Sequence, residues 1–374
     1  MELQKSDRLL SLDVFRGLTI AGMILVNNPG DWGHAYPALK HSAWNGVTPT
    51  DWIFPFFLFI MGVSITYSLS KRKERGDKHE KLLLQIFRRT VILFILGLIS
   101  YSFPYFNLAA QRIPGVLQRI AVCYFVASLI FLKANVKTIS YTAGALLLIY
   151  WGLMSLIPVP EVGYPNLEPT TNLAAWLDRT IIGTSHLWQG TKVWDPEGIL
   201  STVPSISSAL IGVLTGIWLK SKTESSVKVV WMFIAGNFAL IIAAVWDMWF
   251  PINKGIWTSS FVMFTSGMAL LFLATCYWLI DVKGYKWWTK PFIVYGTNAI
   301  TVYFLSEIGA ILLDIIHVTN SAGKQISLGG SLYNSLFTGW LNPPNASLAW
   351  SLLYVLFWLG GTWILYSRKI FIKV

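Results

Sequence analysis

The sequence predicts an all-α membrane protein, a polytopic bundle of about ten transmembrane helices with both termini in the cytoplasm. The first observation behind this prediction is composition, because the 374 residues are 54% hydrophobic and only 13% charged. A soluble domain carries about 25% charged residues. This chain has too little polar surface to cover its core with water, so lipid must replace water around much of it. The other two observations are the lengths of its apolar segments and the distribution of Lys and Arg.

The apolar segments are each long enough to cross a hydrocarbon core of about 30 Å, which takes about 20 helical residues. In chain order they are 9–28, 52–70, 88–106, 115–133, 139–157, 199–219, 229–249, 259–281, 292–313 and 346–367. No segment between them has the composition of a linker or of a soluble second domain. We therefore expect residues 1–374 to form a single transmembrane domain.

Basic residues set the predicted orientation. With the N-terminus inside, the cytoplasmic loops hold Lys and Arg in an excess of about three to one over the opposite side. An even number of spans returns the C-terminus to the cytoplasm. A basic inner face also explains the net charge of +11 without a nucleic-acid partner.

No metal-ligand spacing, phosphate-binding loop or serine-hydrolase motif occurs in the sequence, so we expect no metal.

Two ionisable residues lie within the first span. Charged side chains there cost about 2.5–3.5 kcal/mol each on insertion scales, which makes them candidates for function. Asp13 and Arg16 are three residues apart and share one helix face. One interpretation is an internal ion pair that lowers the insertion cost. The other is that Arg16 faces a cavity for an anion while Asp13 orients it.

A denser polar cluster is expected at the outer membrane face, where Asn27, His41 and Asp51 converge. Histidine, with an ordinary pKa near 6.5, suits removal of a proton from an amine or hydroxyl. An amide could stabilise an oxyanion, and a carboxylate could fix the imidazole tautomer. The alternative is a surface-loop histidine with no role.

Other polar candidates lie in or beside the spans. Gln118 and Arg119 enter the membrane with the fourth span, and Asn298 lies within the ninth. Asp195 and Glu197 open the sixth span, where a plain helix cap competes with a sugar-binding role. The outer loop before the eighth span adds three more: Asn253, Lys254 and Trp257. The ring of Trp257 could stack on a sugar or anchor the chain at the membrane interface.

Several strings of residues resemble those of a known family. RLLSLDVFRG at 8–17 resembles the opening helix of transmembrane acyltransferases. KHSAWNG at 40–46, DWIFPFFLFIMG at 51–62, RIPGVLQR at 112–119, WDPEGIL at 194–200 and RKIF at 368–371 are similar to heparan-α-glucosaminide N-acetyltransferase. The resemblance runs in order over nearly the whole chain. It is most specific at the strings that contain His41 and Asp195.

The resemblance implies transfer of an acetyl group from cytoplasmic acetyl-CoA to the amino group of a terminal glucosamine on the far side of the membrane. His41 falls on the family's active-site histidine and Asn27 on the asparagine beside it. The extra lumenal domain and first helix of the animal enzyme are absent, and Ser306 stands where its pattern has a histidine. These departures predict a multi-pass protein of a bacterial inner membrane. The family also suggests a homodimer.

The residues and the resemblance together give a predicted mechanism. His41 acts as general base and Asn27 stabilises the oxyanion, with Asp51 and Asp13 in support. Prior acetylation of His41 is the competing route. We expect the acyl donor to contact Arg16, Gln118, Arg119 and Asn298, and the sugar to contact Asp195, Glu197, Asn253, Lys254 and Trp257. The functional alternatives are an amino-sugar transporter, or an O-acyltransferase acting on a periplasmic glycan.

Overall fold

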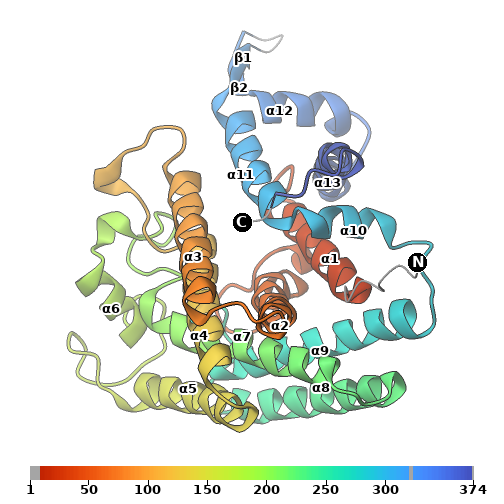
Figure 1. The fold of residues 1–374 in the computed structure, drawn as a ribbon. Coiled ribbons are helices and arrows are strands. Elements are labelled where there is room, and N and C mark those ends of the chain that lie inside the picture. Colours follow the sequence, from red (N-terminus) through yellow and green to blue (C-terminus); the bar gives the residue numbers. More distant parts are fainter. Residues whose placement is uncertain (1–8, 320–322, 373–374) are drawn as a thin grey trace. The chain divides into compact units, whose positions relative to one another are not determined.

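The structure is a computed structural model that describes residues 9–319 and 323–372, and within them its regular secondary structure is almost entirely helical (Figure 1). The longer helices are α1 (Leu10–Asn27), α2 (Ile53–Glu74), α3 (His79–Ser102), α4 (Val116–Lys133), α5 (Val136–Leu156), α7 (Ile199–Lys220), α8 (Ser225–Asp247), α9 (Ser259–Tyr277) and α13 (Pro343–Ser367). The shorter ones are α6 (Leu173–Ile181), α10 (Lys290–Thr297), α11 (Ala299–Ile315) and α12 (Leu328–Tyr333). Strands β1 (His317–Thr319) and β2 (Gln325–Ser327) form an antiparallel hairpin.

Among the described residues, nine helices are long and apolar enough to cross a membrane, or up to ten if α10 and α11 count as one broken span. This confirms the prediction of a polytopic helical membrane protein. The placement of both termini in the cytoplasm stays a prediction.

The predicted ninth span needs a correction. Residues 292–313 do not form one straight helix, because α10 and α11 meet at an angle of 83°. Asn298 lies at the break with non-helical backbone angles. Its side chain donates to the carbonyl of Ile370 at 3.1 Å and accepts from the amide of Ile372 at 2.9 Å. The broken turn is thereby tied to the segment after α13.

Two further elements differ from the expected ranges. Helix α3 begins at His79, well before the predicted start at 88, because its first turns mix charged residues with leucines and so precede the continuous apolar run. The long loop 158–198 contains α6, a nine-residue amphipathic helix capped by Asn172, whose side chain accepts from the amide of Ala175 at 2.9 Å.

The chain divides into two compact units. Of the described residues, the terminal unit contains those up to Tyr36, Thr223–Ala235 and those from Ala269 onward, and the central unit contains Pro37–Lys222 and Gly236–Met268. Helices α8 and α9 each contribute residues to both.

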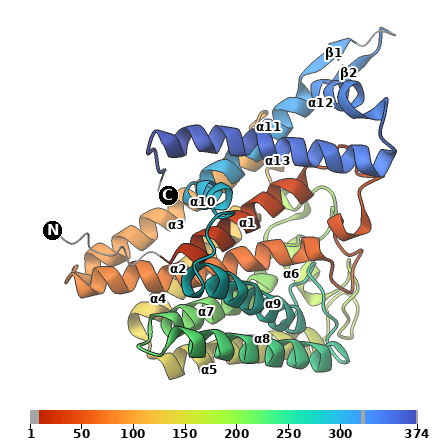
Figure 2. The same cartoon turned by 90° about the vertical axis from the view of Figure 1, so that its right-hand side faces the viewer.

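In the terminal unit, α1 packs against α10 through glycines (Figure 2). A Cβ atom on Gly17 would lie 1.8 Å from the carbonyl oxygen of Phe292, and one on Gly296 would lie 2.2 Å from that of Asp13. Only glycine allows the two backbones to approach this closely. Asp13 and Arg16 of α1 therefore lie on a face that another helix covers.

In the central unit, α2 and α7 form the main helix pair and pack in the same way. A Cβ atom on Gly62 would lie 2.0 Å from the carbonyl oxygen of Ala209, and one on Gly212 would lie 2.1 Å from that of Phe59. Helices α4 and α5 also pack on α7. These contacts hold the helix ends that carry the loops of this unit.

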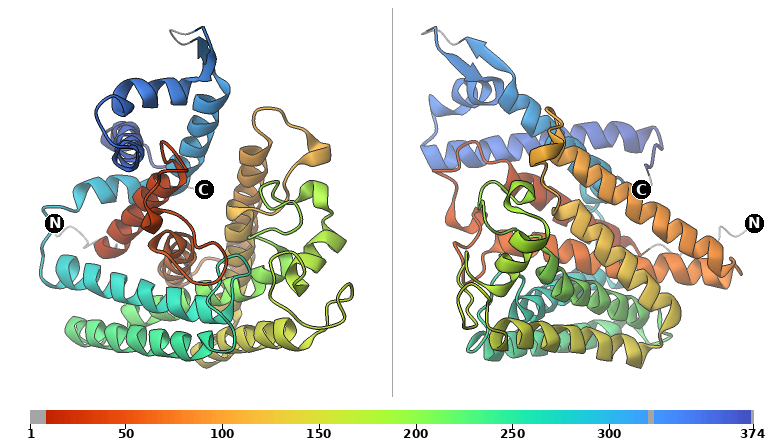
Figure 3. Two further views of the ribbon diagram at one scale, coloured as in Figure 1. Left: turned by 180° about the vertical axis from the view of Figure 1, so that it is seen from behind. Right: turned by 90° about the vertical axis from the view of Figure 1, so that its left-hand side faces the viewer.

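Long loops of the central unit, including those before α2, after α5 and before α9, gather at one end of its helices (Figure 3). The amide of Gly46 donates to the carbonyl of Ile252 at 2.8 Å, which joins the loop before α2 to the loop before α9. Trp44 and Trp194 meet edge-on with ring centroids 5.1 Å apart. Beneath them lies an apolar cluster that includes Tyr150, Phe250 and Ile256. Three segments distant in sequence are thus held together as one loop layer.

The glycine contacts of α2 generate a test. We expect Gly62→Ala to lower the melting temperature of the purified protein in detergent, because overpacking of this kind costs about 1–3 kcal/mol. Gly144→Ala in α5 is the matched control, since a Cβ atom there meets nothing within 4 Å. That control should be neutral or stabilising by up to about 1 kcal/mol. Equal melting temperatures for the two variants would contradict close packing at Gly62.

Candidate active site

A hydrogen-bonded histidine and aspartate lie in the loop layer of the central unit. His41 Nδ1 is 2.7 Å from Asp51 Oδ1, and the carboxylate is fully buried while the imidazole is 47% exposed. The second carboxylate oxygen accepts from the amides of Ser42 at 3.1 Å and Thr48 at 2.9 Å. An ionised carboxylate only accepts hydrogen bonds, so Nδ1 carries the proton in this contact. The pair therefore holds an imidazole in a fixed orientation at a solvent-accessible position.

A lysine from a distant segment lies beside this histidine–aspartate pair. Lys254 Nζ lies 3.0 Å from Nδ1 and 3.2 Å from Nε2 of His41, and 3.7 Å from Asp51 Oδ1. It belongs to the turn between α8 and α9. The side chain of neighbouring Asn253 fixes this turn, because it accepts from the amide of Ile256 at 3.1 Å and donates to Asn45 at 3.1 Å.

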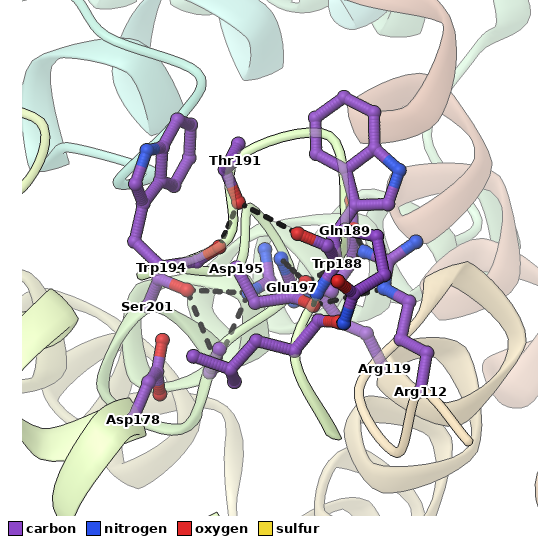
Figure 4. A network of polar contacts seen from close by, with 12 residues as sticks. Arg112, Arg119, Asp178, Trp188, Gln189, Thr191, Trp194, Asp195, Glu197 and Ser201 are labelled. Carbon is purple, nitrogen blue, oxygen red and sulfur yellow. Dashed lines mark hydrogen bonds and ion pairs between the residues drawn. The ribbon is translucent and has the colours of Figure 1, made fainter. Parts of the chain in front are cut away.

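A second charged group, drawn in Figure 4, joins the loop before α4 to the start of α7. Arg112 donates to both oxygens of Asp195, at 2.8 and 2.6 Å, and to Glu197 at 2.5 Å. Its guanidinium also lies over the rings of Tyr101 and Trp188, at 4.7 and 5.7 Å from their centroids. Asp195 and Glu197 thus form ion pairs with a largely buried arginine, and they also directly precede a helix.

The two charged groups influence each other electrostatically. Burial alone would raise the pKa of Glu197, but the positive charges of Arg112, Arg119 and Lys254 outweigh it and lower that pKa. Burial lowers the pKa of Lys254, and the carboxylates of Asp51 and Glu197 oppose this. The loop layer therefore contains alternating charges from four segments of the chain, which stabilise one another in a poorly solvated region.

Gln118 and Arg119 occupy the first turn of α4. Arg119 donates to the hydroxyl of Ser201 and, at 3.2 Å, to the carbonyl of Gly198. Its guanidinium lies 5.0 Å from the ring centroid of Trp257. The Nε and Nη1 atoms of Arg119 and both amide atoms of Gln118 are buried without a hydrogen-bond partner. Unpartnered buried polar groups are costly, which makes this turn a candidate for ligand contact.

Trp257 is fully buried, although we predicted it as a sugar contact. It packs edge-on against Phe54 and Phe261, with centroids 5.0 and 5.2 Å away. With Arg119 above the ring, its described surroundings are those of a core residue. No ring surface of Trp257 is exposed to a sugar in this structure.

The remaining predicted residues belong to the terminal unit. Arg16 donates to Asp13 at 3.0 Å and to the carbonyl of Gly296 at 3.3 Å, so the internal ion pair of α1 is present. Asn27 donates to Glu307 at 3.3 Å. Asn298 is engaged by the backbone after α13, as described above. The catalytic and donor-binding roles of these residues stay predictions.

Three residues of these networks were not among the predicted site residues. Arg112 was visible as a basic residue within the RIPGVLQR string, but its partners lie more than 80 positions away. Asp178 lies in the unpredicted helix α6, and Oδ1 accepts from the amide of Ile199 at 2.9 Å at the start of α7. Glu307 lies in α11 and accepts from Asn27. Of these three residues, only Arg112 lies in a sequence pattern that could have indicated a role.

The fold and the loop layer define a class of protein, a multi-pass helical membrane protein with a buried aspartate–histidine pair beside a charged network. A sequence model described as heparan-alpha-glucosaminide N-acetyltransferase, catalytic, matches residues 8–244. The matched range includes His41, Asp51 and the Arg112 network, and ends before Lys254. The chain therefore belongs to this family.

Two animal proteins called heparan-alpha-glucosaminide N-acetyltransferase are similar to the chain. The protein of Homo sapiens is 31% identical over 98% of this chain and 60% of its own length. That of Mus musculus is 32% identical over 81% of this chain and 54% of its own length. The chain thus spans somewhat more than half the length of these relatives.

The Arg112 network predicts a large stability effect. We expect Arg112→Met to destabilise the protein by about 3–5 kcal/mol, because it leaves the buried carboxylates of Asp195 and Glu197 without a counter-charge. Lys220→Met is the control, since its ion pair with Glu74 at 3.0 Å is much more exposed. Such pairs are worth about 0–1 kcal/mol. Thermal unfolding in detergent measures both, and similar losses would argue against the network.

Asp178 predicts a pH dependence of stability. Burial raises its pKa to about 7 from an ordinary value of 3.8. Since the folded state favours the protonated acid, this contribution to stability is fully present below pH 3.8 and is lost as the pH rises through about 7. Asp178→Asn keeps an acceptor for the Ile199 amide and removes the titration. Its melting temperature should fall less between pH 5 and 8 than that of the unaltered protein, whereas parallel curves would count against this assignment.

Proposed function

We propose that this protein is an acetyltransferase that moves an acetyl group from cytoplasmic acetyl-CoA to the amino group of a glucosamine-type sugar across an inner membrane, with His41 as general base. The observation that carries the proposal is the His41–Asp51 hydrogen bond of 2.7 Å, in a chain that belongs to a family of N-acetyltransferases. Asp51 fixes the Nδ1–H tautomer, which leaves Nε2 to accept a proton.

In the proposed reaction, Nε2 of His41 takes one proton from the acceptor amine and passes it to the leaving thiolate. The acceptor amine attacks the thioester carbon, a C–N bond forms, and Nε2 of His41 takes the proton that the nitrogen loses. The C–S bond then breaks and the thiolate takes that proton from the imidazolium. The products are the N-acetyl sugar and CoA thiol, and His41 returns to its starting state. We favour this direct route over an acetyl-histidine, because an amine held against a thioester needs no covalent relay.

Basic residues on the predicted inner face support docking of the donor there. Phosphate groups of CoA carry negative charge, which Lys and Arg bind well. The buried, unpartnered atoms of Gln118 and Arg119 could receive polar groups of the acyl donor farther along the membrane. We propose these two residues as donor contacts, with Arg16 as a further one.

Asn27 is proposed as the oxyanion-stabilising amide on the strength of the family resemblance. Its bond to Glu307 uses one N–H of the side-chain amide and orients the group. An amide nitrogen has two N–H bonds, so the second could donate to a developing negative charge. Removal of an oxyanion donor costs about 100–1,000-fold in kcat.

The central experiment measures acetyl transfer by the purified protein, with labelled acetyl-CoA and glucosamine as substrates. We expect N-acetylglucosamine as the product and a fall in kcat of at least about 100-fold for His41→Ala, since general bases contribute about 100–10,000-fold. His34→Ala is the matched control, because His34 makes the same 2.7 Å bond to Asp31 with both partners exposed. It should keep full activity.

The same assay separates the alternatives. Absence of product, or full activity of His41→Ala, would overturn the proposal. Uptake of sugar into vesicles without consumption of acetyl-CoA would favour a transporter, and transfer to a glycan hydroxyl would favour an O-acyltransferase. A trapped acetyl group on His41 would replace the direct route with a covalent one.

A further inference from the structure

We propose that Lys254 is a positioning residue that keeps the imidazole of His41 unprotonated and holds it against Asp51. This role is different from the sugar contact that the sequence suggested, and it rests on the proposed function of His41. Three observations carry it: the distances of Nζ from the ring nitrogens, the location of Lys254 on a fixed turn, and the balance of charges around His41.

The distances place the ammonium group against the imidazole, 3.0 Å from Nδ1 and 3.2 Å from Nε2. Nδ1 already donates to Asp51, so it has no lone pair for another donor. Nζ is nearly equidistant from the two ring nitrogens, so it lies over the ring and outside the in-plane lone pair of Nε2, and it acts on the imidazole through its charge. At 3.7 Å from Asp51 Oδ1, the same ammonium also completes an ion pair. One side chain thus touches both the base and the residue that orients it.

The turn that presents Lys254 is held from both sides. The amide of Trp257 donates to the Lys254 carbonyl at 3.1 Å, and the amide of Thr258 donates to the Asn253 carbonyl at 3.1 Å. The Lys254 side chain is 18% exposed, although lysine usually extends into solvent. A lysine held in this way has lost most of its freedom, which favours a positional role.

The charges explain why a lysine is useful here. The negative charge of Asp51 attracts a positive charge on the imidazole. A positive charge 3.2 Å from Nε2 opposes the imidazolium form. The groups that act on this site are Asp51 before α2, Lys254 in the turn before α9, and Lys40 next to His41 in the chain. Burial lowers the pKa of Lys254, the carboxylates of Asp51 and Glu197 raise it, and the charge of Arg119 lowers it further.

The position of Lys254 beside His41 has a consequence both before and after proton transfer. Because Lys254 lies over the ring, the in-plane lone pair of Nε2 stays available to a sugar amine, while the ion pair with Asp51 keeps the ammonium nearby. After proton transfer, the neighbouring positive charge favours rapid delivery of the proton to the leaving thiolate. Lys254 therefore acts through His41 in both halves of the reaction.

The test is chemical modification by diethyl pyrocarbonate, which reacts with unprotonated imidazole, followed by mass spectrometry of the peptide that contains His41. The measured quantity is the ratio of the rate at pH 6 to that at pH 8, in which changes of accessibility cancel. We expect this ratio to fall about threefold or more in Lys254→Met and Lys254→Gln, because the opposing charge is gone. Lys254→Arg should keep it, as should Lys192→Met, which removes another outer-loop lysine.

The His34 peptide of each sample reports any general change in reactivity. An unchanged His41 ratio in both neutral variants would overturn the proposal and leave Lys254 as a sugar contact or a structural residue. A lowered ratio in Lys254→Arg as well would also overturn it, since charge could then not be the cause. The measurement needs no acetyl transfer, so it stands apart from the test of the proposed function. In an active protein, the acid limb of the kcat profile should move to higher pH in Lys254→Gln.

Discussion

The cost of removing charge from water shapes the central unit. Its loop layer buries Asp51, Asp195 and most of Glu197, and each of them has a cation in contact or nearby. A buried charge without a partner would cost several kcal/mol, so these side chains can stay ionised only while their segments remain together. The same pairs that hold the loops in place therefore hold His41 in its orientation, and the site and the fold share one set of contacts.

The helices were largely predictable from the sequence because lipid imposes a simple rule on length and polarity. The rule says nothing about breaks inside an apolar segment. Residues 290–315 are apolar on both sides of Asn298, so the bend there depends on a hydrogen bond to a tail about 70 residues away. Helix α6 was missed for the opposite reason, because nine amphipathic residues in a polar loop are too short for a membrane criterion.

The site was predictable where its residues are close in sequence. His41 and Asp51 are ten positions apart in a polar stretch, and their hydrogen bond is present. Lys254 reaches the same imidazole from 213 positions away, and nothing in its local sequence distinguished a contact with His41 from one with a sugar. Arg112 and its partners show the same limit, since an ion pair between distant loops depends on tertiary structure. Burial also could not be foreseen for Trp257, because tryptophan is equally common at membrane interfaces.

The separation of Arg112 from its carboxylate partners has a consequence for biosynthesis. The ribosome makes Arg112 more than 80 residues before Asp195 and Glu197. Throughout that interval, helices α4 and α5 can enter the bilayer before Arg112 has its carboxylate partners. The loop layer can close only when the beginning of α7 emerges, so the assembly of this half of the protein has a fixed order. A nascent chain stopped before residue 195 would hold its helices in lipid and its future active site open to solvent.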